Sequence, residues 1–174
     1  MKILNVNITN NGGNKIMAFN YDASKFKEAY NKAKENNYSN DPLPEGTYHV
    51  KVEKLEVGET KDGVPMGKIQ FRILEGQYKN KCLFMNQVLF GQDKEGNLTA
   101  FGVKIFDDFI ESLEPSFDDY KFSNCNSKDP VAEYTDLILD VAEDIENLQY
   151  DIKLSYKEVN GKQYAQYKVV EVYE

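Results

Sequence analysis

The sequence is poor in the residues that build metal sites and catalytic centres. Its 174 residues include one histidine, two cysteines, one arginine and no tryptophan. The cysteines, Cys82 and Cys125, form no CxxC pair, so neither a disulfide framework nor a zinc site is expected. With His49 as the only imidazole, nucleophilic catalysis lacks its usual base. We therefore expect no catalytic residue, no metal and no other cofactor, and free thiols in a reducing cytoplasm.

Long apolar runs and glycine-rich phosphate loops are also missing. No stretch approaches the roughly 20 apolar residues of a membrane helix, and the apolar residues near the start are interleaved with asparagine. The glycines are dispersed, without a GxGxxG or GxxxxGK pattern. The adjacent carboxylates of Asp107 and Asp108 fall in an expected helix, where neighbouring side chains point about 100° apart and make poor metal co-ligands. The sequence predicts a cytoplasmic binding protein rather than a membrane protein or an enzyme.

The acidic residues are concentrated in one segment. The net charge is −8, but residues 93–146 carry fifteen acids against four lysines, whereas residues 46–92 carry seven bases against five acids. Because screening limits exposed charges to about 8–10 Å, the local charge decides what a surface binds. The acidic segment is either a solvated helix face or a surface that repels nucleic acid or docks a basic partner, such as a replication or recombination protein.

The stretch from residue 43 to residue 89 predicts three strands joined by short polar turns. The strands are expected at residues 47–57, 68–74 and 81–89, the pattern of a β-meander. In the second strand Ile69, Phe71 and Ile73 share one face. In the first strand the alternation of apolar residues slips, and a bulge near Glu53 and Lys54 would restore it.

The third strand can place either of two sets of residues in the core. We assign Leu83, Met85 and Leu89 to the core, which leaves Phe84 and Asn86 on the outer side. There they join the polar residues of the second strand, which are Lys68, Gln70 and Arg72. An exposed aromatic ring beside amide and basic groups is typical of a platform on which bases stack. The alternative is that a loop or a helix covers Phe84.

Helices and a hairpin complete the expected fold. Apolar spacing predicts helices at 101–113 and 130–145, although residues 136–142 could form a short strand instead. Two alternating runs, 149–157 and 163–173, flank an Asn-Gly pair within a loop at 158–162 and predict a β-hairpin. Three strands, a helical connection and two strands follow the order of a five-stranded OB barrel. The predicted fold is mainly β, of the α+β class: an OB-like barrel over residues 42–174, preceded by an arm at 1–41 containing a hairpin and a short helix.

Several of these segments resemble a known family. They are Phe19–Phe26, Leu43–Tyr48, the Ile73–Lys81 turn, and Leu83–Val88 leading into the 101–113 helix. Together they resemble phage-encoded single-stranded-DNA-binding proteins with an OB-like barrel, well over residues 17–113 and more loosely in the closing hairpin. The resemblance implies sequence-tolerant binding of single-stranded DNA in support of phage DNA replication or recombination in a bacterial host. Small barrels similar to this family often pair, and the arm is a candidate handle for a homo-oligomer.

The candidate contacts combine basic residues for phosphates with aromatic residues for bases. Arg72 is the leading candidate, because a guanidinium both pairs with phosphate and stacks on a base. Stacking is assigned to Phe84 and to tyrosines of the closing hairpin. The full set of expected nucleic-acid contacts is Lys51, Lys68, Arg72, Lys79, Lys81, Phe84, Lys153, Tyr156, Tyr164, Tyr167 and Lys168.

A protein-interaction module is the alternative function. In that case the edge of the barrel and residues 93–146 recruit replication or recombination partners, or block a host enzyme, and no nucleic acid is bound. The position of the basic residues separates the two hypotheses. If the basic groups converge in one groove with exposed aromatic rings, nucleic acid is favoured. If they are scattered among acids, a protein partner is favoured. The basic groups concerned are those of Lys68, Arg72, Lys79 and Lys81.

Overall fold

The structure is a computed structural model that describes residues 28, 31 and 42–174. The chain divides into two units, residues 1–43 and 44–174. The arm expected at residues 1–41, with its hairpin and short helix, lies outside the described residues apart from positions 28 and 31. Within the described part of the chain, no helix is long and apolar enough to cross a membrane.

The second unit contains the strands and helices that the sequence predicts, together with a pair of two-residue strands that it does not. In chain order they are β1 (Gly46–Glu59), β2 (Pro65–Ile73), β3 (Cys82–Val88), β4 (Gly91–Gln92), β5 (Leu98–Thr99), α2 (Phe101–Leu113), α3 (Pro130–Asp144), β6 (Gln149–Val159) and β7 (Lys162–Tyr173), with short 3-10 turns at Pro115–Tyr120 and Phe122–Asn124. The alternative of a strand at 136–142 is wrong, because that stretch lies inside α3. This helix begins with Pro130, and the Asp129 carboxylate accepts the Ala132 N–H at its first turn.

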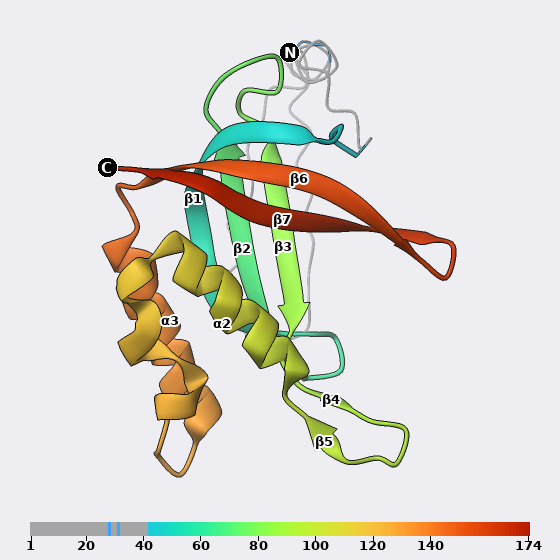
Figure 1. The fold of residues 1–174 in the computed structure, drawn as a ribbon, viewed down its shortest axis with the longest axis vertical. Helices are drawn as coiled ribbons and strands as arrows, with labels where there is room; N and C mark the ends of the chain where they lie inside the picture. Colours follow the sequence, from blue (N-terminus) through green and yellow to red (C-terminus); the bar gives the residue numbers. More distant parts are fainter. Residues whose placement is uncertain (1–27, 29–30, 32–41) are drawn as a thin grey trace, which may run out of the picture. The chain divides into compact units, whose positions relative to one another are not determined.

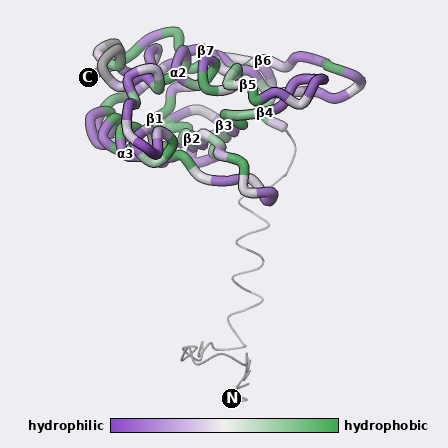
Figure 2. Tube along the Cα trace, turned by 90° about the horizontal axis from the view of Figure 1, so that it is seen from below, coloured by the Kyte–Doolittle hydropathy of each residue, from purple (hydrophilic) through white to green (hydrophobic). Residues whose placement is uncertain are grey.

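Five of the strands form one antiparallel sheet in the order β3-β2-β1-β6-β7. The β6–β7 hairpin crosses in front of β1–β3, on the same side as α2 (Figures 1 and 2). The two edge strands, β3 and β7, are not paired by a backbone ladder in the described residues. The predicted mainly β, α+β class is therefore confirmed, while the sheet is not closed into a barrel.

The core lies on the inner side of this sheet, as the alternation of apolar residues predicts. Ile69, Phe71 and Ile73 of β2 are fully buried, and β3 contributes Leu83. Phe84 is 57% exposed and Leu89 is buried, which confirms the face assigned to the third strand, although Met85, also assigned to the core, is only half-buried. The predicted bulge is also present: the pairing of β1 with β2 shifts register between Val52 and Lys54, and the shift returns Leu55 to the core.

Helix α2 approaches the sheet closely because glycines face it. A Cβ atom at Gly67 of β2 would lie 2.5 Å from the Phe106 ring of α2. A Cβ atom at Gly102 of α2 would lie 1.8 Å from the carbonyl oxygen of Val88 on β3. The Val103 N–H donates to the Leu89 carbonyl at 3.1 Å. These contacts hold the start of α2 against the end of β3, so that the rest of the helix runs beside both edge strands.

Candidate nucleic-acid interface

The predicted bulge in β1 determines how the leading candidate, Arg72, is held. It turns the Glu53 carboxylate towards β2, where Arg72 donates to both of its oxygens at 2.6 Å and Gln70 donates at 3.0 Å. A further Arg72 nitrogen donates to the Asn80 carbonyl at 2.7 Å. The Arg72 guanidinium also holds the pKa of Glu53 below its usual range. Arg72 therefore ties β1, β2 and the β2–β3 turn together, and its guanidinium is already engaged.

The other basic residues of the β1–β3 outer face lie among acids. This outer face consists of Lys51, Glu53, Lys54, Glu56, Lys68, Gln70, Arg72, Cys82, Phe84, Asn86 and Val88. Lys54 forms an ion pair with Glu56 at 2.8 Å, and Lys68 lies directly opposite Glu56. Lys79 and Lys81 lie in the β2–β3 turn, where the Lys81 ammonium is 5.6 Å from the centre of the Tyr78 ring. The structure does not gather these cations into one groove with exposed aromatic rings.

The β6–β7 hairpin has a tighter turn than its sequence predicts. Only Asn160 and Gly161 lie between the strands, both with positive φ (53° and 75°), as a two-residue hairpin turn requires. Val159 consequently pairs with Lys162, and the register continues down the hairpin to the pair of Lys153 and Lys168. Cross-strand partners share a face, so this register decides which side chains lie together.

One side of the hairpin, which we name the lysine face, is basic over most of its length. It consists of Lys153, Ser155, Lys157, Val159, Lys162, Tyr164, Gln166 and Lys168. Its four lysines are exposed, and none of them forms an ion pair with a described residue. Lys153 and Lys168 lie directly opposite each other, an arrangement that costs stability unless an anion lies between them. Figure 2 colours most of the projecting end of the hairpin hydrophilic.

Two predicted stacking residues lie on the other side of the hairpin. The Tyr167 ring is 6.2 Å from the ring of Phe71, and its hydroxyl donates to the Phe84 carbonyl at 3.0 Å. Burial raises the pKa of Tyr167. Tyr156 is half-buried on this inner side, and its backbone N–H donates to Glu45. Tyr167 thus spans the gap between β7 and β3, while Tyr164, which is 53% exposed, is the hairpin tyrosine that offers a free ring face.

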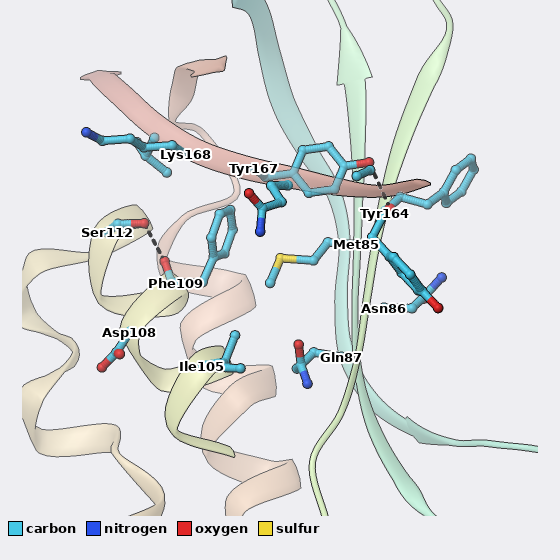
Figure 3. A pocket seen from close by; sticks show the side chains of 14 residues that line it. Met85, Asn86, Gln87, Ile105, Asp108, Phe109, Ser112, Tyr164, Tyr167 and Lys168 are labelled. Carbon is cyan, nitrogen blue, oxygen red and sulfur yellow. Dashed lines mark hydrogen bonds between the residues drawn. The ribbon is translucent and has the colours of Figure 1, made fainter. Parts of the chain in front are cut away.

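A groove of about 720 Å³ lies between β3, α2 and β7. Met85 and Gln87 enter it from β3, Ile105 and Phe109 enter it from α2, and Tyr167 crosses one end (Figure 3). Phe84, Asn86, Tyr164, Gln166 and Lys168 also line it. Four of the predicted contacts, Phe84, Tyr164, Tyr167 and Lys168, therefore meet at one groove, which the lysine face adjoins through Lys168.

Comparison with known families places part of this surface in a recognised family. Residues 19–114 match a family described as protein of unknown function (DUF669). The chain belongs to this family. No curated protein and no solved structure matches the chain. The DUF669 match includes the β1–β3 outer face and α2, whereas the lysine face lies beyond it.

Sequence reasoning missed three residues of this surface. Lys157 and Lys162 complete the lysine face, and Gln166 adds an amide to the rim of the groove. The Asn-Gly pair contained the signal, because a two-residue turn pairs residue 159 with residue 162 and so sets all four lysines on one side.

The only histidine, His49, lies on the same side of the sheet as the lysine face, beside the start of β6. His49 Nδ1 lies 2.8 Å from the Asp151 carboxylate and its Nε2 lies 2.8 Å from the Gln149 side-chain oxygen. The hydrogen bond to Asp151 raises the pKa of His49, and the same bond lowers the pKa of Asp151. Tyr173 donates to the second Asp151 oxygen at 2.9 Å. The arrangement ties β1, β6 and β7 together.

Proposed function

We propose that this protein binds single-stranded DNA without strong sequence preference, in support of phage DNA replication or recombination. The observation that carries the proposal is the lysine face, whose four lysines are exposed and form no ion pair with a described residue. A phosphate backbone supplies the anions that such a surface lacks, and its counterions are released on binding. The opposed pair of Lys153 and Lys168 would gain most, since a phosphate between them relieves their repulsion.

The strand order supports an OB-like interpretation of the fold. The sheet order is β3-β2-β1-β6-β7, and the helices lie between β3 and the β6–β7 hairpin. This is the order of a five-stranded Greek-key barrel that is opened between β3 and β7. The Tyr167 hydroxyl bridges that opening by bonding to the Phe84 carbonyl. OB barrels are frequent platforms for single-stranded nucleic acid. The resemblance to phage single-stranded-DNA-binding proteins points to the same function.

Exposed aromatic rings favour a single strand over a duplex. Phe84 and Tyr164 line the same groove and keep more than half of their surface exposed. A ring can stack on a base only where the base is not already stacked within a duplex, and such stacking tolerates any sequence. Duplex recognition relies instead on a helix or ribbon that enters the major groove and on arginine contacts to guanine.

The proposal is tested by fluorescence anisotropy with labelled oligo-dT, an RNA oligomer of equal length and a duplex, at low and high salt. We expect salt-sensitive binding that is tightest for oligo-dT. The variant Lys153→Gln/Lys168→Gln should bind at least tenfold more weakly, with a salt dependence shallower by about 1.4 because two phosphate contacts are lost. The matched control is Lys94→Gln/Lys128→Gln, which removes the same charge from exposed positions outside the hairpin. Equal losses in the two variants would contradict the assignment of the lysine face.

A protein-interaction module is the second candidate. It is favoured by the β1–β3 outer face, where Arg72 and Lys54 are already paired with Glu53 and Glu56. Such a mixed surface is better suited to a polar protein interface than to a phosphate backbone. Absence of binding to all three oligomers at low salt would favour this candidate, and a pull-down with phage and host replication proteins would follow.

A further inference from the structure

We propose that the groove between β3, α2 and β7 receives a nucleobase that is turned out of the bound strand, while the phosphates stay on the lysine face. This inference rests on the proposed function and adds to the same site a second part, which contacts the base rather than the phosphate. It is carried by the shape of the groove, by the groups that line it and by the distribution of charge around it.

The shape admits a nucleotide but not a strand of protein. The groove volume of about 720 Å³ falls within the range of roughly 300–1,000 Å³ that small-molecule sites occupy. An added β-strand would need the free backbone edges of β3 and β7 along their length. Tyr167 crosses that space, and its hydroxyl occupies the Phe84 carbonyl on the β3 edge. Figure 3 shows Tyr167 lying across one end of the groove, with the side chains of Met85, Phe109 and Ile105 below it.

The lining combines an apolar floor with amide groups at the rim. Met85, Ile105 and Phe109 provide the floor. Gln87 points into the groove from β3, where its amide nitrogen donates to the Val88 carbonyl at 2.9 Å, and Gln166 lines the groove from β7 without a hydrogen-bond partner among the described residues. Each amide offers both donors and an acceptor. A base whose edge is free of Watson–Crick pairing presents the complementary groups, and its two flat sides match the apolar and aromatic walls.

Charge separates the base from its phosphate. Asp108 of α2 lines the groove and is paired with Lys104 at 2.5 Å, so the inner wall offers no uncompensated cation to a phosphate. Lys168 is the cation that belongs both to the groove lining and to the lysine face. A nucleotide bound at this boundary would direct its phosphate to the exposed lysines and its uncharged base into the groove.

The test fills the groove without touching the lysine face. Ile105 is 37% exposed and faces β3 across the groove, so Ile105→Trp should occupy the space of the base. The control is Leu139→Trp, a similar enlargement at a 46% exposed position on α3. The probes are labelled oligo-dT and an oligomer of the same length built from abasic deoxyribose phosphates. The chain has no tryptophan, so each new indole reports its own surroundings by fluorescence.

We expect Ile105→Trp to weaken oligo-dT binding roughly tenfold, to leave abasic binding unchanged, and to show a buried indole. Leu139→Trp should bind both probes like the wild type. Wild-type affinity of Ile105→Trp for oligo-dT would overturn the groove inference and leave the lysine-face proposal intact. Failure of the wild-type protein to bind either probe would instead overturn the proposed function.

A second measurement needs no variant. Oligo-dT carrying 5-iododeoxyuridine, irradiated in complex with the wild-type protein, should cross-link to residues inside the groove, among them Met85, Phe109 or Tyr167. Cross-links confined to residues 153–162, with none in the groove, would overturn the inference even if Ile105→Trp failed to fold.

Discussion

The two basic stretches of the sheet's outer surface differ in what their cations already bind. On the β1–β3 outer face, Arg72 is fixed by Glu53 and Lys54 pairs with Glu56. On the lysine face, four lysines stand without an acid between residues 153 and 168, because Glu158 pairs with Gln163 on the opposite side of the hairpin. A phosphate approaching the first surface must displace a carboxylate, whereas the second offers its charge directly. The number of cations in a segment is therefore a poor guide to a binding site unless their partners are known.

The largest effect is expected from removing the two exposed aromatic rings that line the groove, Phe84 and Tyr164. Because each stacked base contributes about 1–3 kcal/mol, Phe84→Ala/Tyr164→Ala should weaken oligo-dT binding by roughly fivefold or more per base lost. The melting temperature should stay nearly constant, since both rings are exposed. Phe101→Ala is the matched control, because Phe101 is 71% exposed and does not line the groove. Anisotropy and thermal melting are the measurements, and an equal loss of binding in the control would refute the stacking role.

The second-largest effect is expected at Lys168 of the lysine face, where one substitution should raise stability and weaken binding. Lys168→Glu turns the like-charged pair with Lys153 into an opposite-charged one, which should stabilise the fold by about 0.2–1 kcal/mol. The same change should weaken oligo-dT binding severalfold, because it removes a phosphate contact and adds repulsion. Urea titration and anisotropy on one preparation measure both. A variant that lost stability as well as binding would argue against the opposed-lysine geometry.

On the β1–β3 outer face, we expect a substitution to lower stability and to leave binding almost unchanged. Arg72→Ala breaks the two-pronged bond to Glu53 and should cost about 1 kcal/mol of unfolding free energy, with a change in oligo-dT affinity of less than about twofold. Glu53→Gln should reproduce most of the stability loss. A variant Arg72→Ala that melted normally but no longer bound oligo-dT would restore Arg72 as a direct phosphate contact.

The smallest effect concerns His49, which lies on the same surface beyond the lysines. Its pKa is raised by Asp151, so the stabilisation from its charged form is complete below about pH 6.5 and is lost as pH rises through the raised value. The pKa of Asp151 is lowered, so its share is complete above about pH 3.9 and is lost as pH falls through the lowered value. His49→Gln should therefore lower the melting temperature more at pH 6 than at pH 9. A difference that grew with pH would contradict this pairing.

The fold was largely predictable, because its elements follow from local patterns. Alternation in β2, four-residue spacing in α2 and the Asn-Gly pair of the hairpin each correspond to an observed element. The bulge was predictable too, but its consequence was not, since nothing in the sequence indicates that Glu53 contacts Arg72, which lies nineteen residues further along the chain.

The site was less predictable, for two physical reasons. A loop of five residues at 158–162 would place Lys153 opposite Tyr167, whereas the observed turn places it opposite Lys168. That shift of one residue exchanges the faces that the two strands present to each other, and the expected loop at 158–162 kept Lys162 out of the strands altogether. The groove is lined by residues of β3, α2 and β7, which lie far apart in the sequence. Contacts between such distant segments leave no periodic pattern in the sequence.

The unpaired edges of β3 and β7 have a consequence for hydrogen exchange. In an edge strand every second backbone amide points away from its neighbour, and in the described residues no ladder joins these two edges. Amides along β3 and β7 should therefore alternate between slow and fast exchange, while β2, which is paired on both sides, remains protected. A ligand seated between the edges would slow the fast set alone, so the pattern of exchange along two strands would locate it without any substitution.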